Sequence, residues 1–170
     1  GSIQISASVA LFVPKSHTPF QWCGQISPDE ALRRVTDYIG RRSSEHVSIN
    51  LHIPERPVVV RMCSPLFEWV IENLMKNSLD ALQGQGSIEV VVGESGNTVF
   101  VEVSDTGKGI AKSNWTRIFE PGFTTKTRGW GLGLSLAKRI IEEYHKGKIF
   151  VKSSVVGQGT TFRVSLKKTT

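Results

Sequence analysis

The longest amphipathic pattern in the chain runs from Ser64 to Leu82, and it constrains the rest of the fold. Ser64-Pro65 is typical of a helix start, and Gly84 and Gly86 are typical of a helix end. Between them an apolar stripe recurs at helical spacing, formed by Leu66, Phe67, Val70, Ile71, Leu74, Met75, Leu79 and Leu82. A face this apolar needs cover from other elements, so we expect the segment to be the central helix.

The segments around it are predicted to be helices and paired strands. Ser27, Pro28 and Glu30 form a helix start with a capping box, which predicts a helix over 28–42. Apolar spacing predicts another helix over 132–144. Alternating or β-branched residues predict strand pairs at 47–53 with 58–62, 88–92 with 99–103, and 148–153 with 160–166. We expect the first pair to be antiparallel, joined by the turn at 54–57.

This order predicts an α+β fold, in which helices pack on one face of a mixed β-sheet, because the strands come as hairpins and not as alternating βαβ units. A chain of 170 residues suits a single globular domain. We place that domain at 27–170. Residues 1–26 are interpreted as a cleavage scar, Gly1-Ser2, followed by an irregular segment.

Composition excludes several classes of function. No apolar run approaches the roughly 18 residues of a membrane span. Cys23 and Cys63 lack a nearby partner, which argues against zinc and disulfides and favours a reducing compartment. The net charge of +6 suits phosphates, but the 21 basic residues are dispersed without interleaved aromatics. We therefore expect no nucleic-acid partner.

Two glycine runs point to a nucleotide held largely by main-chain groups. The first is Asp105 to Ile110, where a carboxylate at a strand end can accept from the exocyclic amine of adenine, although Asp-Thr-Gly is also good turn chemistry. The second is Gly129 to Leu134, which opens a helix whose N–H groups suit phosphate. Neither run has Walker A or dinucleotide-fold spacing.

Two further features fit the same ligand. Asn73 and Asn77 lie one helical turn apart, so their amide oxygens can face a nucleotide or hydrated Mg²⁺; the alternative is a solvated polar face. The irregular stretch between the glycine runs resembles a mobile lid, from which Lys126 and Arg128 can reach phosphates. Phe119 in that stretch either anchors the lid in the core or meets a partner.

Five segments together resemble the catalytic ATP-binding domain of sensor histidine kinases, of the gyrase, Hsp90, histidine kinase and MutL superfamily. They are Glu72–Ala81 for the N box, Asp105–Ile110 for the G1 box, Ile118–Thr124 for the F box, Gly129–Leu134 for the G2 box, and Gly157–Phe162 for the terminal G-x-G-T-x-F element. The resemblance implies a Bergerat-type two-layer α/β sandwich with a flexible ATP lid.

The resemblance also implies cofactors and roles. ATP and Mg²⁺ are the expected cofactors, with Asn73 and Asn77 on the metal, and Asn73, Asn77, Lys126 and Arg128 as the catalytic set. The expected cofactor-binding residues are Asn73, Asn77, Asp80, Asp105, Gly107, Gly109, Ile110, Phe119, Thr125, Lys126, Arg128, Gly129, Trp130, Gly131, Leu132, Gly133, Leu134 and Thr160. Trp130 departs from the small residue common in this run, and is expected either to stack over the lid or purine edge, or to pack.

Asn73 bears on the reaction type. Other superfamily members carry a glutamate at this position that acts as general base toward water, and an amide cannot take that proton. Transfer of the γ-phosphoryl to a histidine on another domain is therefore expected in place of simple hydrolysis. The histidine box is not found, because His17 lacks the following acid and the helix. We expect this fragment to bind ATP without autophosphorylating.

The partners implied are a histidine-bearing dimerisation domain of the same protein and a response regulator. The fragment is expected to be a monomer and the full-length protein a homodimer. Kinases of this type are usually membrane-anchored, with this domain in the cytoplasm. Two other readings remain open, namely an anti-sigma-factor-type serine kinase and a nucleotide-binding sensor without kinase activity.

Overall fold

The structure is a computed structural model that describes residues 24–124 and 130–169. Its elements are β1 (Gly24–Ile26), α1 (Pro28–Gly40), β2 (Val47–His52), β3 (Val60–Met62), α2 (Ser64–Leu82), β4 (Gly86–Ser95), β5 (Thr98–Asp105), 3₁₀ turns at Lys112–Asn114 and Arg117–Phe119, α3 (Gly133–Arg139), a π-helical turn at Ile140–Tyr144, β6 (Lys148–Val155) and β7 (Gly159–Lys167). No helix among the described residues has the length and apolar character needed to cross a bilayer.

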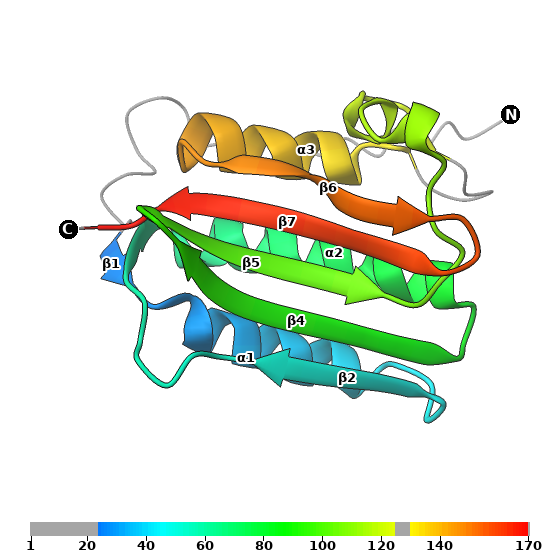
Figure 1. The fold of residues 1–170 in the computed structure, drawn as a ribbon, viewed down its shortest axis with the longest axis horizontal. Helices are drawn as coiled ribbons and strands as arrows, with labels where there is room; N and C mark the ends of the chain where they lie inside the picture. The colour runs from blue at the N-terminus through cyan, green and yellow to red at the C-terminus, as the bar shows by residue number, and fades with distance from the viewer. Residues whose placement is uncertain (1–23, 125–129, 170) are drawn as a thin grey trace, which may run out of the picture.

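The main sheet has five strands in the order β2-β4-β5-β7-β6. β2 and β4 run parallel, whereas the other neighbours are antiparallel. Figure 1 shows α1, α2 and α3 together on one side of this sheet. The predicted α+β class, with a mixed sheet and helices on one face, is confirmed.

The predicted antiparallel pair formed by 47–53 and 58–62 is wrong. β2 pairs in parallel with β4, in a register that places Val47 opposite Gly86, and β3 instead pairs with the short strand β1. The chain returns from β2 to β4 through α2, which is the long crossover that a parallel pair requires. Pro54 and Pro57 lack the backbone N–H groups that would extend a local hairpin.

The core lies between α2 and the inner face of the sheet. The buried side of α2 consists of Phe67, Val70, Ile71, Leu74, Met75, Ser78 and Leu82. Facing it are alternate residues of the central strands, including Val90, Val101, Val103 and Val164, all buried. This packing confirms the expectation that 64–82 is the central helix.

The predicted helix starts differ in accuracy. Ser27 does cap α1, because its Oγ accepts from the backbone N–H of Asp29 at 3.3 Å. For α2 the prediction is off by one residue, since the helix already includes Ser64 and the cap position is Cys63, which makes no side-chain capping bond. The N–H of Cys63 is satisfied elsewhere, by a histidine side chain 82 residues later in the chain.

That histidine is His145, which follows the π-helical turn. Its Nδ1 lies 2.9 Å from the carbonyl oxygen of Ile140 and its Nε2 lies 3.1 Å from the N–H of Cys63. The first contact requires a proton on Nδ1 and the second requires a lone pair on Nε2, so the ring is held as one neutral tautomer. Burial lowers the pKa of His145.

Strand β6 contains a bulge. Val151 lies opposite Phe162 but Ser153 already lies opposite Thr161, so Lys152 is an extra residue in the ladder. The bulge shifts the alternation of side chains, and Ser154 comes to lie opposite Thr160. Beyond the bulge, the hairpin between β6 and β7 approaches the loop that follows β5.

We predict that the neutral state of His145 makes the stability of the domain depend on pH. Its pKa is lower in the folded chain than the usual 6.5, so below about pH 6.5 the unfolded chain binds the extra proton and stability falls as pH falls. Thermal melts between pH 8 and pH 5.5 should show this decline. The slope should flatten in His145→Gln.

His52→Gln is the matched control, because His52 is exposed on β2. This variant should keep the slope of the parent chain. An unchanged slope in His145→Gln would contradict the assignment of the neutral tautomer.

Candidate functional site

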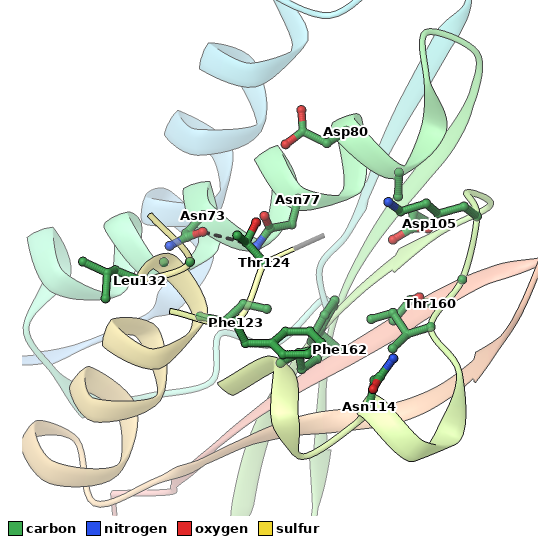
Figure 2. A pocket seen from close by; sticks show the side chains of 18 of the residues that line it. Asn73, Asn77, Asp80, Asp105, Asn114, Phe123, Thr124, Leu132, Thr160 and Phe162 are labelled. Atoms are coloured by element: carbon green, nitrogen blue, oxygen red, sulfur yellow. Dashed lines mark hydrogen bonds between the residues drawn. The ribbon is translucent and has the colours of Figure 1, made fainter. Parts of the chain in front are cut away.

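A cavity of about 940 Å³ opens beside α2, between that helix, the loop after β5 and the segment that leads into α3. Its size falls within the range of sites for cofactors and drug-sized ligands. Figure 2 shows Asn73, Asn77 and Asp80 along α2, with Asp105 and Thr160 across the space from them. The cavity therefore joins the helix, the sheet and both glycine segments.

One side of α2 supplies amides to this cavity. The apolar stripe of the helix packs on the sheet, so residues 73, 77 and 80 are turned toward the opening. Nδ2 of Asn77 donates to Oδ1 of Asn73 at 3.3 Å, which fixes the relative orientation of the two amides. The two predicted asparagines thus form one hydrogen-bonded unit on the wall of the cavity.

Asp105 lies at the end of β5, and its side chain is almost fully buried. Its Oδ1 accepts from the N–H of Gly107 at 2.9 Å, and its Oδ2 accepts from the hydroxyl of Ser78 at 3.0 Å. The backbone of Thr160 also favours the ionised carboxylate. Burial raises the pKa of Asp105, and these three interactions oppose the rise without reversing it.

The first glycine loop is held tightly against its neighbours. Gly109 has φ +70°, and a Cβ there would lie 2.1 Å from the carbonyl oxygen of Val155 in the β6–β7 hairpin. The next residue, Ile110, donates its N–H to Oγ of Ser154 at 2.7 Å, and the same hydroxyl contacts Oγ1 of Thr160 at 2.8 Å. The hairpin therefore fixes the shape of this loop.

The described part of the second glycine run contacts the asparagine pair. A Cβ on Gly133 would lie 2.6 Å from Nδ2 of Asn73, so a side chain at the first residue of α3 would displace the Asn73 amide. Leu132 and Trp130 border the same opening. Trp130 is 86% exposed, so of the two expectations for this residue the packed one is excluded.

The aromatic residues of the predicted lid are placed differently from one another. Phe119 is buried and meets the ring of Phe162 edge to face, with centroids 6.4 Å apart. Phe123 lies at the cavity, and the guanidinium of Arg117 sits 5.2 Å from its ring centroid. Phe119 therefore anchors this segment in the core and does not line the cavity.

The structure brings most of the sequence-predicted residues together. The ones that line the cavity are Asn73, Asn77, Asp80, Asp105, Gly109, Ile110, Trp130, Gly131, Leu132, Gly133, Leu134 and Thr160. Gly107 and Phe119 do not line it, although Gly107 contacts Asp105. Thr125, Lys126, Arg128 and Gly129 lie outside the described residues.

Some lining residues were not predicted from the sequence. Trp69, Lys108, Asn114 and Thr124 also border the cavity. Lys108 lies inside the first glycine run and Thr124 inside the predicted lid, so their positions in these motifs could have indicated that they lie near the ligand. Trp69 and Asn114 belong to no predicted motif of the site, and only the tertiary fold places them here.

The donor groups bear on whether a metal fits. The described residues contain no group of three or more His, Cys, Asp or Glu side chains arranged to hold an ion. Asn73 and Asn77 offer amides, and Mg²⁺ typically keeps several waters and binds through phosphates with few protein ligands. The site therefore fits a Mg²⁺ that comes with a nucleotide, and does not fit a cage built of protein ligands alone.

Comparison with known proteins places the chain in a family. Residues 64–170 match the family described as histidine kinase-, DNA gyrase B-, and HSP90-like ATPase. Sensor histidine kinase ZraS of Salmonella typhimurium strain LT2 is 46% identical over 98 residues, which is 57% of this chain and 21% of that protein. Sporulation kinase A of Bacillus subtilis strain 168 is 39% identical over 99 residues, which is 58% of this chain and 16% of that protein.

The chain thus spans about a fifth of the length of the curated relatives that it matches. Among solved structures, the catalytic domain of histidine kinase ThkA superposes with a TM-score of 0.78 at 27% identity, covering 86% of this chain and 95% of that one. A second ThkA structure, in complex with the response regulator TrrA, gives a TM-score of 0.74 at 25% identity, covering 86% and 42%.

The family match covers α2 with its asparagine pair, both glycine runs and strands β4 to β7. The chain belongs to the family of histidine kinase-, DNA gyrase B- and HSP90-like ATPases, and within it to the ATP-binding domains of sensor histidine kinases.

Proposed function

We propose that this domain binds Mg-ATP in the cavity beside α2 and donates the γ-phosphoryl group to a histidine on a dimerisation domain outside this chain. The observation that carries the proposal is that an asparagine pair and a buried aspartate lie along one cavity. These groups supply metal and phosphate contacts in one part of the cavity and a base-recognition acceptor in another.

Asp105 is the proposed partner of the adenine base. A buried carboxylate at the end of β5 offers an acceptor, and the exocyclic amine of adenine is a donor. A guanine would present a carbonyl oxygen in place of that amine, and two acceptors repel. Base choice is thereby assigned to one side chain and to the loop that holds it.

Asn73 and Asn77 are the proposed partners of the phosphates and of Mg²⁺. When bound, Mg²⁺ would offset the negative charge that phosphoryl transfer leaves on the phosphate oxygens. The asparagines orient the phosphates, and the close approach of Gly133 to Asn73 lets the main chain of the second glycine run reach the same region. We assign the γ-phosphate to Lys126 and Arg128, which are not among the described residues.

The acceptor is proposed to be a histidine and not water because an amide, and not a carboxylate, stands at residue 73. Asn73 stands where other superfamily members have a glutamate, and its Oδ1 already accepts from Asn77. The neighbouring Glu72 forms an ion pair with Lys76 at 2.6 Å and does not line the cavity. Hydrolysis is therefore disfavoured, and phosphoryl transfer to a positioned acceptor is favoured.

The wider assembly is inferred from the relatives. The complex of ThkA with the response regulator TrrA supports a response regulator as partner of the full-length protein. We further propose that residues 27–170 form the catalytic domain, that it is monomeric alone and works in the cytoplasm, and that the full-length protein is a membrane-anchored homodimer.

Asp105→Asn is predicted to lose nucleotide binding without losing the fold. A fluorescent ATP analogue should bind at least about tenfold more weakly, because the charged acceptor for the base amine is gone. The raised pKa of Asp105 means that its ionised form opposes folding near neutral pH, so the melting temperature of the variant should not fall.

Glu89→Gln is the control for this test, since Glu89 is an exposed acid on β4 and does not line the cavity. It should bind the analogue as the parent chain does. Equal binding by Asp105→Asn and the parent would remove the proposed base site.

Mg²⁺ is predicted to bind only together with nucleotide. Millimolar Mg²⁺ alone should leave the melting temperature unchanged, because the described residues hold no carboxylate cluster for it. With ATP present, adding Mg²⁺ should raise the melting temperature beyond the effect of ATP alone. Stabilisation by Mg²⁺ without ATP would contradict this assignment.

Phosphoryl transfer is predicted to need a second domain. The chain alone should form no phosphohistidine with labelled ATP, whereas adding the histidine-bearing domain of the same protein should label that domain. Asp105→Asn should abolish the labelling. Acid-stable phosphoserine on an added protein would favour the serine-kinase alternative, and tight ATP binding with no transfer to any domain would favour the sensor.

A further inference from the structure

A buried serine on α2 stands out from the apolar residues around it. Ser78 is 1% exposed and lies on the core side of the helix with Leu74, Met75 and Leu82. A buried hydroxyl needs a hydrogen-bond partner, since leaving it unpaired costs free energy. A smaller apolar residue would fill this place in the core with no such need.

The partner of Ser78 is not the usual one. A serine inside a helix commonly bonds to a carbonyl oxygen of the preceding turn. Here Oγ of Ser78 donates to Oδ2 of Asp105, 27 residues later in the chain, at 3.0 Å. The bond runs from the central helix to the strand end that the cavity exposes.

The hydrogen bonds of Asp105 leave part of its capacity unused. An ionised carboxylate has about four acceptor positions. Gly107 takes one on Oδ1 and Ser78 takes one on Oδ2. The carboxylate therefore keeps acceptor capacity for a ligand that enters the cavity.

We propose that Ser78 is a positioning residue for base recognition, which holds the Asp105 carboxylate so that a free acceptor position faces the amine of a bound adenine. This inference rests on the proposed binding of ATP. Ser78 does not line the cavity and so acts through Asp105 and not on the ligand. Without the hydroxyl, the carboxylate could rotate and its Oδ2 would lose the donor on α2.

Charge around Asp105 allows the effect to be measured. The groups that lower the pKa of the Asp105 carboxyl, which belong to Gly107, Ser78 and Thr160, are all neutral. The other ionisable groups that line the cavity, among the described residues, are Asp80 on α2 and Lys108 on the loop after β5. Neither contributes to the shifted pKa of Asp105, which burial raises and the Ser78 hydroxyl lowers. Removing the hydroxyl should raise that pKa further.

The first test compares Ser78→Ala with Ser104→Ala in the absence of nucleotide. Ser104 precedes Asp105, but its hydroxyl forms a hydrogen bond with the hydroxyl of Thr161, at 2.9 Å. Ser104→Ala therefore removes the same chemical group without removing a hydrogen bond to the carboxylate. Carbon-13 NMR titration of the Asp105 carboxyl should give a pKa about one unit higher in Ser78→Ala. Ser104→Ala should titrate like the parent.

The second test measures nucleotide binding. In Ser78→Ala the dissociation constant for ATP should rise about tenfold, and the preference for ATP over GTP should narrow. Ser104→Ala should retain both values. Alanine favours the helix, so the variant should fold. Ser78→Cys provides a second variant, since a thiol is a weaker donor of similar shape and should give intermediate values.

Three results would count against the proposal, and they are distinguishable. If the parent chain binds ATP and Ser78→Ala has the same pKa for Asp105, the same affinity and the same preference for ATP over GTP, then Ser78 only fills space. If the parent chain binds neither nucleotide, the proposed function fails first. A tenfold loss of affinity that Ser104→Ala shares would also reject a specific role for Ser78.

Discussion

The structure depends on one helix that has to satisfy two environments. The apolar stripe of α2 packs on the central strands of the sheet and is part of the core, with Phe67, Ile71 and Leu74 fully buried. The same packing turns Asn73 and Asn77 outward to the cavity, because a helix that buries one side fixes the direction of the other. The fold and the site therefore cannot be altered independently along this helix.

Much of the fold followed from local patterns in the sequence. The strand pairs β4–β5 and β6–β7 are hairpins whose β-branched runs and glycine turns lie close together in the chain, and both are confirmed. The predicted pairing of β2 was wrong because its partner β4 comes after α2 in the chain. Alternating apolar residues in one segment predict a strand but not the strand that pairs with it. No sequence pattern predicted the π-helical turn before His145 or the contact of that histidine with Cys63.

The site divides along the same line. Asp105, Gly109 and Gly133 were predicted from their positions in short motifs, and the structure places all three at one cavity. Trp69 and Asn114 reach that cavity through the tertiary fold alone. The role of the Ser78 hydroxyl could not be predicted either, because its acceptor, Asp105, lies 27 residues later in the chain.

The bulge in β6 shows that the number of residues in a strand can determine which side chains reach the site. Because Lys152 is an extra residue in the ladder, Ser154 lies opposite Thr160, and its hydroxyl oxygen accepts a hydrogen bond from the N–H of Ile110. In an unbulged strand the alternation of faces would run one step out of phase, and the hydroxyl would turn away from the glycine loop. Inserting or deleting a residue in this edge strand would therefore disturb the glycine loop even if every residue at the cavity were kept.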